Sequence, residues 1–224
     1  MAVVAQTIRE QVASACRILA LEGYADLTLG HVSARGADGS IWIKRKGIGL
    51  DEVDQDDVVE ADGEDVELHL ETALHTAVYS VRPDVGAVVH GHPPYATALA
   101  ATGSELELLT HDAVLFADGL GRYDAPDLIV DDEQGAAVAG ALGPHRGVLL
   151  RNHGVLTVGK DVAWAVLAAL TLERAARLQS IASTLGALRP IPGPVAHALQ
   201  PVKYQDRFVA EYWEAWLRRL RPAG

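Results

Sequence analysis

The chain has 224 residues, of which 49% are hydrophobic and 22% charged, a composition typical of globular proteins and unlike that of disordered or fibrous ones. Thirty acidic residues against 19 basic ones give a net charge of −11, which argues against general nucleic-acid binding because that requires a basic surface. With one cysteine, no export signal and no apolar run of about 18 residues, we expect a cytoplasmic protein that neither needs disulfides nor enters a membrane.

The first part of the chain is predicted to form a helix and then a β-hairpin. Apolar residues recur every three or four positions over 7–21, which is helical spacing, and Gly23 ends the helix. Short apolar segments follow, and the glycine-containing loop 36–39 is typical of a hairpin that joins strands near 31–34 and 40–46. A sheet therefore begins in this region.

The middle of the chain is predicted to alternate helices and strands. Helical spacing returns over 66–81, and Pro83 follows as a stop signal. The next elements are a strand over 85–90, a helix over 94–101 and a strand over 113–116. This mixture indicates an α/β protein and does not suit an all-strand barrel.

The following part is predicted to contain two further strands and a long helix. The strands lie over 148–150 and 155–158, and Asp161 can cap a helix that Gly186 ends. No repeat or change of composition divides the chain, so we expect a single domain over 1–224.

The C-terminal segment, from about residue 200, is predicted to be helical. A proline-rich connector over 190–194 leads to a helix over 204–220, which carries an aromatic residue at every fourth position, at Phe208, Tyr212 and Trp216. This spacing fits a contact either with the protein core or between subunits.

Three of the nine histidines follow predicted strands. His90 and His92 stand at the end of the strand over 85–90 and can project to the same side, because side chains alternate along a strand. His153 comes after the next buried strand and precedes Gly154, where the backbone can turn tightly. Three histidines at strand ends fit a catalytic metal site, which takes three protein ligands and leaves a position for substrate.

Glu71 is the candidate acid or base beside these histidines. It lies on the predicted helix next to Leu70 and Leu74, which we expect to face inward, and a carboxylate there is costly unless it is paired or near a cation. A solvated charge on the helix face is the alternative interpretation.

These residues resemble the class II aldolase/adducin family. The resemblance covers about residues 7–185 and depends on five short segments: Gly30–Arg35, Glu71, Arg82–Asp84, Ala87–His92 and Asn152–Gly154. It implies an α/β/α fold around a central, mainly antiparallel sheet, and a homotetramer with active sites between subunits. It also implies a divalent metal on His90, His92 and His153, with Glu71 as the proton carrier.

The sequence departs from the sugar-phosphate aldolases of this family where they hold phosphate. Those enzymes use an Asn in the first loop, a small hydroxylated residue before a Gly, and a Ser-Ser pair before the catalytic Glu. The matching positions here are His31, Lys46 before Gly47, and His69 followed by Leu70. We therefore take His31, Lys46, Gly47 and His69 as candidate substrate-binding residues.

A run of three cations, Lys44, Arg45 and Lys46, interrupts an otherwise acidic chain. Such a run is either a solvated charge cluster that protects a sheet edge or part of the site. For Lys46 we favour a site role. Asp112 is a further departure, because the aldolases carry an acidic Tyr at that position.

The resemblance is nearer to the family's aromatic dicarboxylate decarboxylases, of the dihydroxyphthalate type, than to its sugar-phosphate aldolases. We therefore predict a metal-dependent lyase that decarboxylates a hydroxylated aromatic dicarboxylic acid, a small-molecule substrate. A carbon that loses CO₂ must be reprotonated, and Glu71 with a raised pKa could donate the proton, with His69 or His31 as rival donors.

Two other functions stay open at this point. The first alternative is a class II aldolase that cleaves a sugar phosphate or hydroxy acid, and the second is an adducin-like interaction module without catalysis. The presence of all three histidines counts against the module. Three imidazoles suit zinc, manganese, iron or cobalt, so the sequence does not name the metal.

Overall fold

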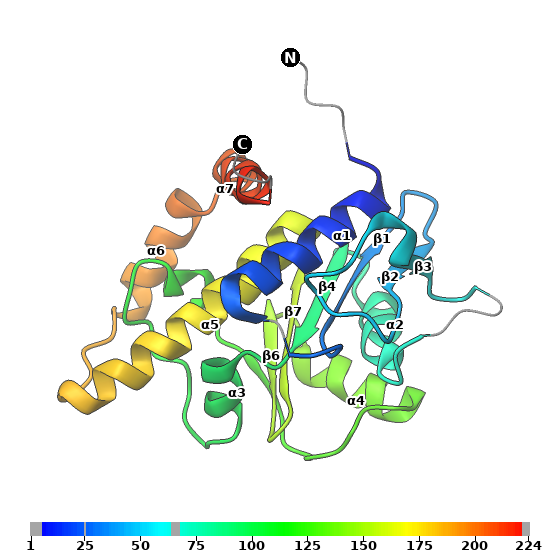
Figure 1. Ribbon diagram of the computed structural model, residues 1–224. Coiled ribbons are helices and arrows are strands. Elements are labelled where there is room, and N and C mark those ends of the chain that lie inside the picture. The colour runs from blue at the N-terminus through cyan, green and yellow to red at the C-terminus, as the bar shows by residue number, and fades with distance from the viewer. Residues whose placement is uncertain (1–5, 25, 64–67, 221–224) are drawn as a thin grey trace.

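The computed structural model describes residues 6–24, 26–63 and 68–220, which form a central sheet between layers of helices (Figure 1). The strands are β1 His31–Arg35, β2 Ile41–Lys44, β3 Val58–Glu60, β4 Ala87–Gly91, β5 Gly121–Tyr123, β6 Gly147–Leu150 and β7 Gly154–Gly159. The helices are α1 Ile8–Leu19, α2 Thr72–Val81, α3 Pro94–Ala100, α4 Asp132–Leu142, α5 Val162–Leu185, α6 Gly193–Lys203 and α7 Asp206–Arg219. No helix in these ranges combines the length and apolar character needed to cross a membrane.

The sheet has the strand order β3-β2-β1-β4-β7-β6-β5 and is mixed. Neighbouring strands are antiparallel except β5 and β6, which run parallel with Gly121 opposite Val148. Because the chain passes from β5 to β6 through helix α4, it crosses over and enters β6 in the same direction. The expected mainly antiparallel sheet is therefore corrected to a mixed one.

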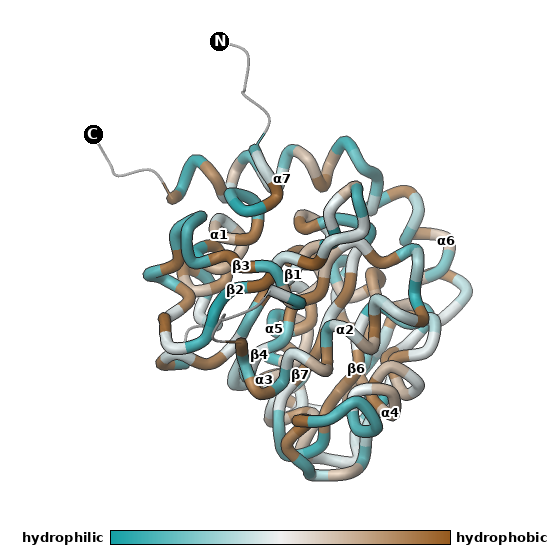
Figure 2. The backbone as a smooth tube through the Cα atoms, turned by 90° about the vertical axis from the view of Figure 1, so that its right-hand side faces the viewer, coloured by the Kyte–Doolittle hydropathy of each residue, from teal (hydrophilic) through white to brown (hydrophobic). Residues whose placement is uncertain are grey.

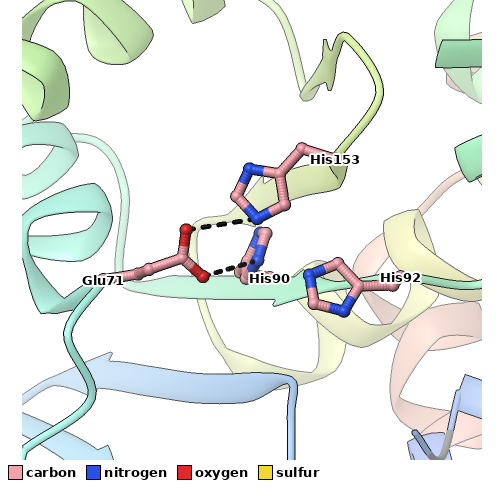
Figure 3. A group of neighbouring side chains, drawn as sticks. All are labelled: Glu71, His90, His92 and His153. Atoms are coloured by element: carbon pink, nitrogen blue, oxygen red, sulfur yellow. Dashed lines mark ion pairs between the residues drawn. The ribbon is translucent and has the colours of Figure 1, made fainter. Parts of the chain in front are cut away.

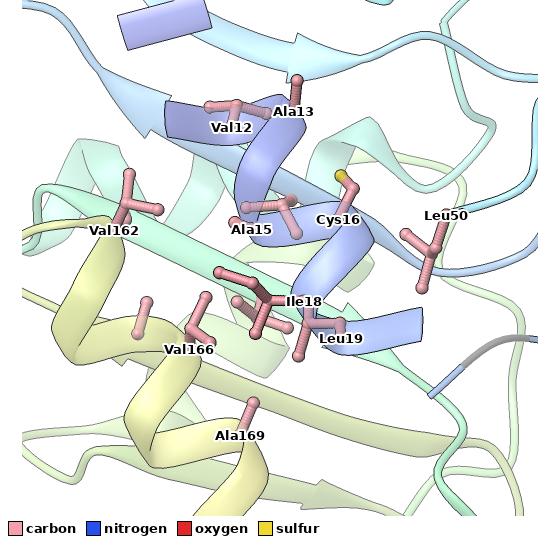
Figure 4. Packing of buried hydrophobic residues seen from close by; sticks show 14 of the residues in the cluster. Val12, Ala13, Ala15, Cys16, Ile18, Leu19, Leu50, Val162, Val166 and Ala169 are labelled. Carbon is pink, nitrogen blue, oxygen red and sulfur yellow. The ribbon is translucent and has the colours of Figure 1, made fainter. Parts of the chain in front are cut away.

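Helices cover both faces of the sheet, and strand β4 contributes to both cores. Ala87 and Val89 pack with α1 and α5 on one face, where Cys16 is also buried (Figure 4). Val88 packs with α2 and α4 on the other face. This alternation gives the α/β/α arrangement, and it places His90 on the same face as Val88, toward α2.

The C-terminal helices pack on the outside of the sheet's helical layer. Figure 2 shows α7 at the periphery with alternating hydrophobic and hydrophilic residues. Val209 is buried, and Trp216 packs against two of the apolar clusters that α5 helps to form. Tyr212 is 38% exposed. The predicted aromatic stripe is thus divided between this chain's own core and its surface.

Several predicted elements differ from the structure. Residues 113–116 form a short 3-10 helix and not a strand, since their buried side chains pack under α5 and α6 rather than in the sheet. Helices α4 and α6 and the short strands β3 and β5 were not predicted. The predicted cap is confirmed, because the Asp161 side chain accepts a hydrogen bond from the Trp164 backbone N–H at the start of α5, which ends before Gly186.

The predicted helix over 66–81 is shorter in the structure. Helix α2 begins at Thr72, with Glu71 as its N-cap, and residues 66 and 67 lie outside the described residues. Leu70 is 71% exposed, whereas Leu74 is buried as expected. Leu70 does not face inward because it precedes the helix and therefore does not share the helical face of Leu74.

Candidate metal centre

Three histidines and one glutamate meet at one end of strand β4 (Figure 3). Glu71, His90, His92 and His153 each offer one ligand atom, and these atoms all lie within 4.8 Å of one another. Imidazole nitrogens and a carboxylate oxygen are donors that zinc and similar divalent metals accept. These four residues could therefore hold a metal ion.

The pairing of β4 with β7 brings the histidines together. His90 lies in β4, and His92 follows the end of that strand. His153 lies in the turn between β6 and β7, directly after Asn152, whose φ of 56° is in the left-handed region. Gly91 is paired with Val155, so the end of β4 and the start of β7 lie side by side.

The turn that carries His153 approaches β4 closely. A Cβ atom on Gly154 would lie 2.6 Å from the Gly91 carbonyl oxygen and 2.6 Å from Cδ2 of His92. These distances are too short for any side chain. Glycine at this position is therefore what allows two of the histidines to come together.

In each of two histidines, one ring nitrogen contacts an oxygen atom and the other has no hydrogen-bond partner among the described residues. Nδ1 of His90 lies 3.1 Å from the Val155 carbonyl oxygen, and Nδ1 of His92 lies 3.4 Å from Oδ2 of Asp26. The Nε2 atoms of both rings are buried and lack a hydrogen-bond partner among the described residues. Burial, together with His90 and His153, lowers the pKa of His92 to about 4. A neutral imidazole that donates Nδ1–H offers Nε2 to a metal, so these rings fit one.

Glu71 faces the histidines from the start of α2. Its Oε1 atom lies 3.1 Å from Nε2 of His153 and its Oε2 atom 3.5 Å from Nε2 of His90. Burial alone raises the pKa of this carboxyl group, but the close contacts with the His153 and His90 rings outweigh that effect and hold the pKa below its usual range. The raised pKa that Glu71 would need to begin as the proton donor is therefore not found, and Glu71 is a carboxylate.

Two candidate substrate-binding residues, His31 and His69, adjoin this cluster. Nε2 of His31 lies 4.0 Å from Oε2 of Glu71, and the His31 ring centroid is 4.9 Å from that of His90. The His69 ring centroid is 4.4 Å from that of His31. Burial, and then the neighbouring Lys44, lowers the pKa of His69 to about 4, so its ring is neutral.

The cation run lies beside His69. Lys44 is fully buried, and its Nζ atom donates to the carbonyl oxygens of Thr28 and Arg45 and lies 3.2 Å from Nε2 of His69. Lys44 is therefore not a solvated charge at the edge of the sheet, because β3 pairs with β2 and covers it on that side. Lys46 is exposed in the turn after β2.

Gly47 follows Lys46 in this turn with a φ of +80°, a conformation that glycine adopts without strain. The buried contact of Lys44 with His69 was missed at the sequence level. The sequence did contain one indication of it: Lys44 directly follows the apolar residues 41–43 and so belongs to the same strand.

Asp112 lies apart from the cation run and contacts the C-terminal helices. Its carboxylate pairs with Lys203 at 2.6 Å and with Arg174 at 3.5 Å, and its carbonyl oxygen accepts a hydrogen bond from the Tyr204 hydroxyl. These contacts attach the C-terminal region to the body of the protein.

Comparisons with known proteins agree with this geometry. Residues 10–180 match the Class II Aldolase and Adducin N-terminal domain. The chain is 34% identical over 204 residues to a 3,4-dihydroxyphthalate decarboxylase from Arthrobacter keyseri, covering 82% of each chain. It is 30% identical over 178 residues to an L-fuculose phosphate aldolase from Methanococcus maripaludis, covering 76% of this chain and 94% of the aldolase.

A solved structure of an aldolase II superfamily protein from Pseudomonas syringae has the same fold. It superimposes with a TM-score of 0.85 at 26% sequence identity, covering 95% of this chain and 91% of that one. The chain therefore belongs to the class II aldolase and adducin family, is one of its lyases, and is nearer to the family's aromatic dicarboxylate decarboxylases than to its sugar-phosphate aldolases.

Proposed function

We propose that the protein is a metal-dependent decarboxylase of a hydroxylated aromatic dicarboxylic acid, similar to dihydroxyphthalate. The observation that supports this most directly is the arrangement of imidazoles around the candidate metal centre. His31 and His69 occupy two positions where the family's aldolases hold phosphate, and the His31 ring lies beside His90. The small amide and hydroxyl side chains that hold phosphate in the aldolases are therefore replaced here by imidazole rings, of which His31 is buried and His69 half-buried.

His90, His92 and His153 would hold the divalent ion in this proposal. Zinc, manganese, iron and cobalt are all suited to such ligands. A metal bound there supplies Lewis-acid polarisation of substrate oxygens, which favours electron withdrawal into an aromatic ring. The protein's own contribution is to orient the rings, as the contacts of His90 with Val155 and of His92 with Asp26 do.

Glu71 moves the proton. As a carboxylate facing the cluster, it can accept the proton of a substrate hydroxyl group and return a proton to the ring carbon. The carbon–carbon bond to the departing CO₂ breaks, its electron pair stays on the ring carbon, and that carbon takes the proton. His31 and His69 are neutral, so they contribute as hydrogen-bond donors and not as charged acids.

Lys46 binds the second carboxylate of the substrate. Lys44 is already engaged with two backbone carbonyl groups and His69, whereas Lys46 is exposed at the turn that Gly47 completes. A charge-assisted hydrogen bond from an ammonium group to a carboxylate favours a diacid over a monoacid. In this proposal, His69 lies between the turn and the metal ligands.

We further propose that residues 1–224 form one domain that assembles as a homotetramer with copies meeting near the site. Leu70, Leu128 and Val130 are 71%, 54% and 48% exposed, and Ile129, beside the last two, donates its backbone N–H to Glu71. Exposed apolar side chains so close to a site favour coverage by a second chain. Light scattering should give the mass of four chains, and a fully active monomer would contradict this assembly.

Aldol cleavage is the second candidate. The aldolase from Methanococcus maripaludis is matched over 94% of its length, and the same ligands and carboxylate serve that chemistry. The absence of the aldolases' acidic Tyr, replaced here by Asp112, argues against it, because Asp112 pairs with Lys203 and Arg174.

One experiment tests both candidates. The purified protein is analysed for bound metal and then screened for CO₂ release from aromatic ortho-hydroxy dicarboxylic acids, with sugar phosphates as the parallel substrates. We expect a bound divalent metal and CO₂ release from at least one diacid. Cleavage of sugar phosphates without CO₂ release from any diacid would replace the decarboxylase by the aldolase.

A further inference from the structure

Polar side chains on one face of strand β1 lie opposite polar side chains on one face of helix α2. His31 and Ser33 alternate along β1 and so point to the same side, toward α2. Glu71, His75 and Tyr79 recur at every fourth position from the N-cap of α2 and so line the facing side of the helix. The two rows lie opposite each other between the sheet and the helix.

Four of these side chains, those of Tyr79, Ser33, His75 and His31, form a continuous series of hydrogen bonds that ends beside Glu71. The Tyr79 hydroxyl lies 2.9 Å from Oγ of Ser33, which lies 2.6 Å from Nδ1 of His75. Nε2 of His75 lies 2.6 Å from Nδ1 of His31, and Nε2 of His31 faces Oε2 of Glu71 at 4.0 Å. Ser33 and His75 are fully buried, and Tyr79 is 5% exposed.

The Tyr79 end of this series of hydrogen bonds decides which atom donates in each of them. In the described part of the chain, Ser33 is the acceptor available to the Tyr79 hydroxyl. If Tyr79 donates to Ser33, the buried Ser33 hydroxyl needs an acceptor of its own, which among the described contacts is Nδ1 of His75, and His75 then donates from Nε2 to Nδ1 of His31. The reverse direction would leave the buried Tyr79 O–H without an acceptor, which costs about 1–3 kcal/mol.

The Glu71 end favours the same direction. When Nδ1 of His31 accepts, its Nε2 carries the proton and presents an N–H to the Glu71 carboxylate. In the reverse direction a nitrogen lone pair would face the carboxylate oxygen instead. Because Nδ1 of His31 accepts the His75 proton in this direction, the ring proton of His31 is the one on Nε2.

The chain of hydrogen bonds does not lead to solvent. A path that supplies protons during turnover needs an end that exchanges with water, but the Tyr79 hydroxyl belongs to a buried side chain. The arrangement instead resembles the outer partners that fix the tautomer of a functional histidine.

We propose that Tyr79, Ser33 and His75 are positioning residues that hold His31 as the Nε2–H tautomer, with this N–H directed at Glu71. His31 then keeps the Glu71 carboxylate in place for proton transfer. The catalytic consequence rests on the proposed function of Glu71. The tautomer itself does not, because it follows from the contacts of β1 with α2.

The tautomer is measured directly by correlating ring protons with ring nitrogens in the NMR spectrum of ¹⁵N-histidine-labelled protein, without added metal and with equimolar zinc. The His31 signals are assigned by their loss in His31→Asn. We expect a proton on Nε2 and none on Nδ1 of His31. A proton on Nδ1 in the wild-type protein would overturn the proposal, and this measurement needs no variant of the other three residues.

Substitution of Ser33 tests the positioning role. Ser33→Ala removes the hydroxyl group that selects the His75 tautomer, so His31 should show a mixture of tautomers, and kcat should fall about 10- to 100-fold with little change in KM. Ser33→Thr keeps a hydroxyl group and should restore both readouts. Ser14→Ala is the matched control, because Ser14 is also buried but its hydroxyl group contacts Gln6 outside this chain of hydrogen bonds.

The outcomes separate this inference from the proposed function. An unchanged His31 spectrum in folded Ser33→Ala would refute the hydrogen-bond chain. A changed spectrum with unchanged kcat would refute the positioning role. If no diacid releases CO₂, the proposed function fails, but the wild-type spectrum still decides the tautomer.

Discussion

The carbonyl oxygen of Val155 lies 3.1 Å from Nδ1 of His90, across the pair of strands β4 and β7. The backbone of one strand thereby orients a histidine of its neighbour and leaves Nε2 of that ring available to a metal. The geometry of the site is therefore set by the same strand pairing that forms the centre of the sheet.

Removal of one imidazole should abolish metal retention. His92→Ala deletes a buried Nε2 atom from the set of proposed ligands, so we expect dialysed protein to contain far less than one divalent ion per chain and to lose activity. Metal analysis by mass spectrometry gives the content. His111→Ala, at an exposed histidine outside the cluster, is the control. Full metal content and activity in His92→Ala would exclude this ligand set.

Glu71→Gln should separate metal binding from catalysis. Glutamine keeps the size of the side chain and can still accept the N–H of Ile129, but it cannot carry the proton. We expect unchanged metal content and a kcat lower by about 10²–10⁴. Glu211→Gln, at an exposed position on α7, should leave kcat unchanged. Near-normal turnover in Glu71→Gln would reduce Glu71 to a structural role.

Gly154→Ala should weaken the site without removing a ligand. The added Cβ would meet the Gly91 carbonyl oxygen and the His92 ring at 2.6 Å, so His92 must move. We expect zinc affinity to fall and the free energy of unfolding to drop by about 1–3 kcal/mol. Gly140→Ala in α4 has open space around it and should be neutral or stabilising by up to about 1 kcal/mol. Zinc affinity in Gly154→Ala equal to that of Gly140→Ala would contradict the close approach.

Lys46→Met should weaken turnover of a diacid more than that of its monoacid analogue. Loss of a charge-assisted contact worth about 1.5–3 kcal/mol corresponds to about ten- to a hundredfold in kcat/KM. Lys44→Met should instead lower stability, because it leaves the carbonyl groups of Thr28 and Arg45 without their buried donor. Equal losses on both substrates in Lys46→Met would show that Lys46 does not bind the second carboxylate.

The residues of the site were predictable where local pattern decides position. The apolar run before His90, and the strand before His153, indicate strand ends, and strand ends of one sheet meet at a common edge. Asp161 was predictable as a cap for the same reason, because a cap depends only on the residues that follow it.

Properties that depend on distances between remote residues were not predictable. The pKa of Glu71 falls because His153 and His90 reach its carboxylate, and spacing along the chain does not give those distances. The start of α2 at Thr72 was missed because apolar spacing continues through Leu70, which the fold leaves exposed. The short strand β5 carries too few residues for a periodic pattern, so the parallel edge of the sheet was missed as well.

The pairing of β4 with β7 also has a consequence for folding. His90 and Val155 are 65 positions apart in the chain, and closing a loop of that length costs entropy before any contact compensates for it. Helices α1 and α5 can begin to form from local contacts, but the three imidazoles meet only when this distant pair of strands has joined. A metal signal followed during refolding is therefore expected to appear with the closure of the sheet's centre, after helical structure, and a bound ion should slow the opening of those two strands.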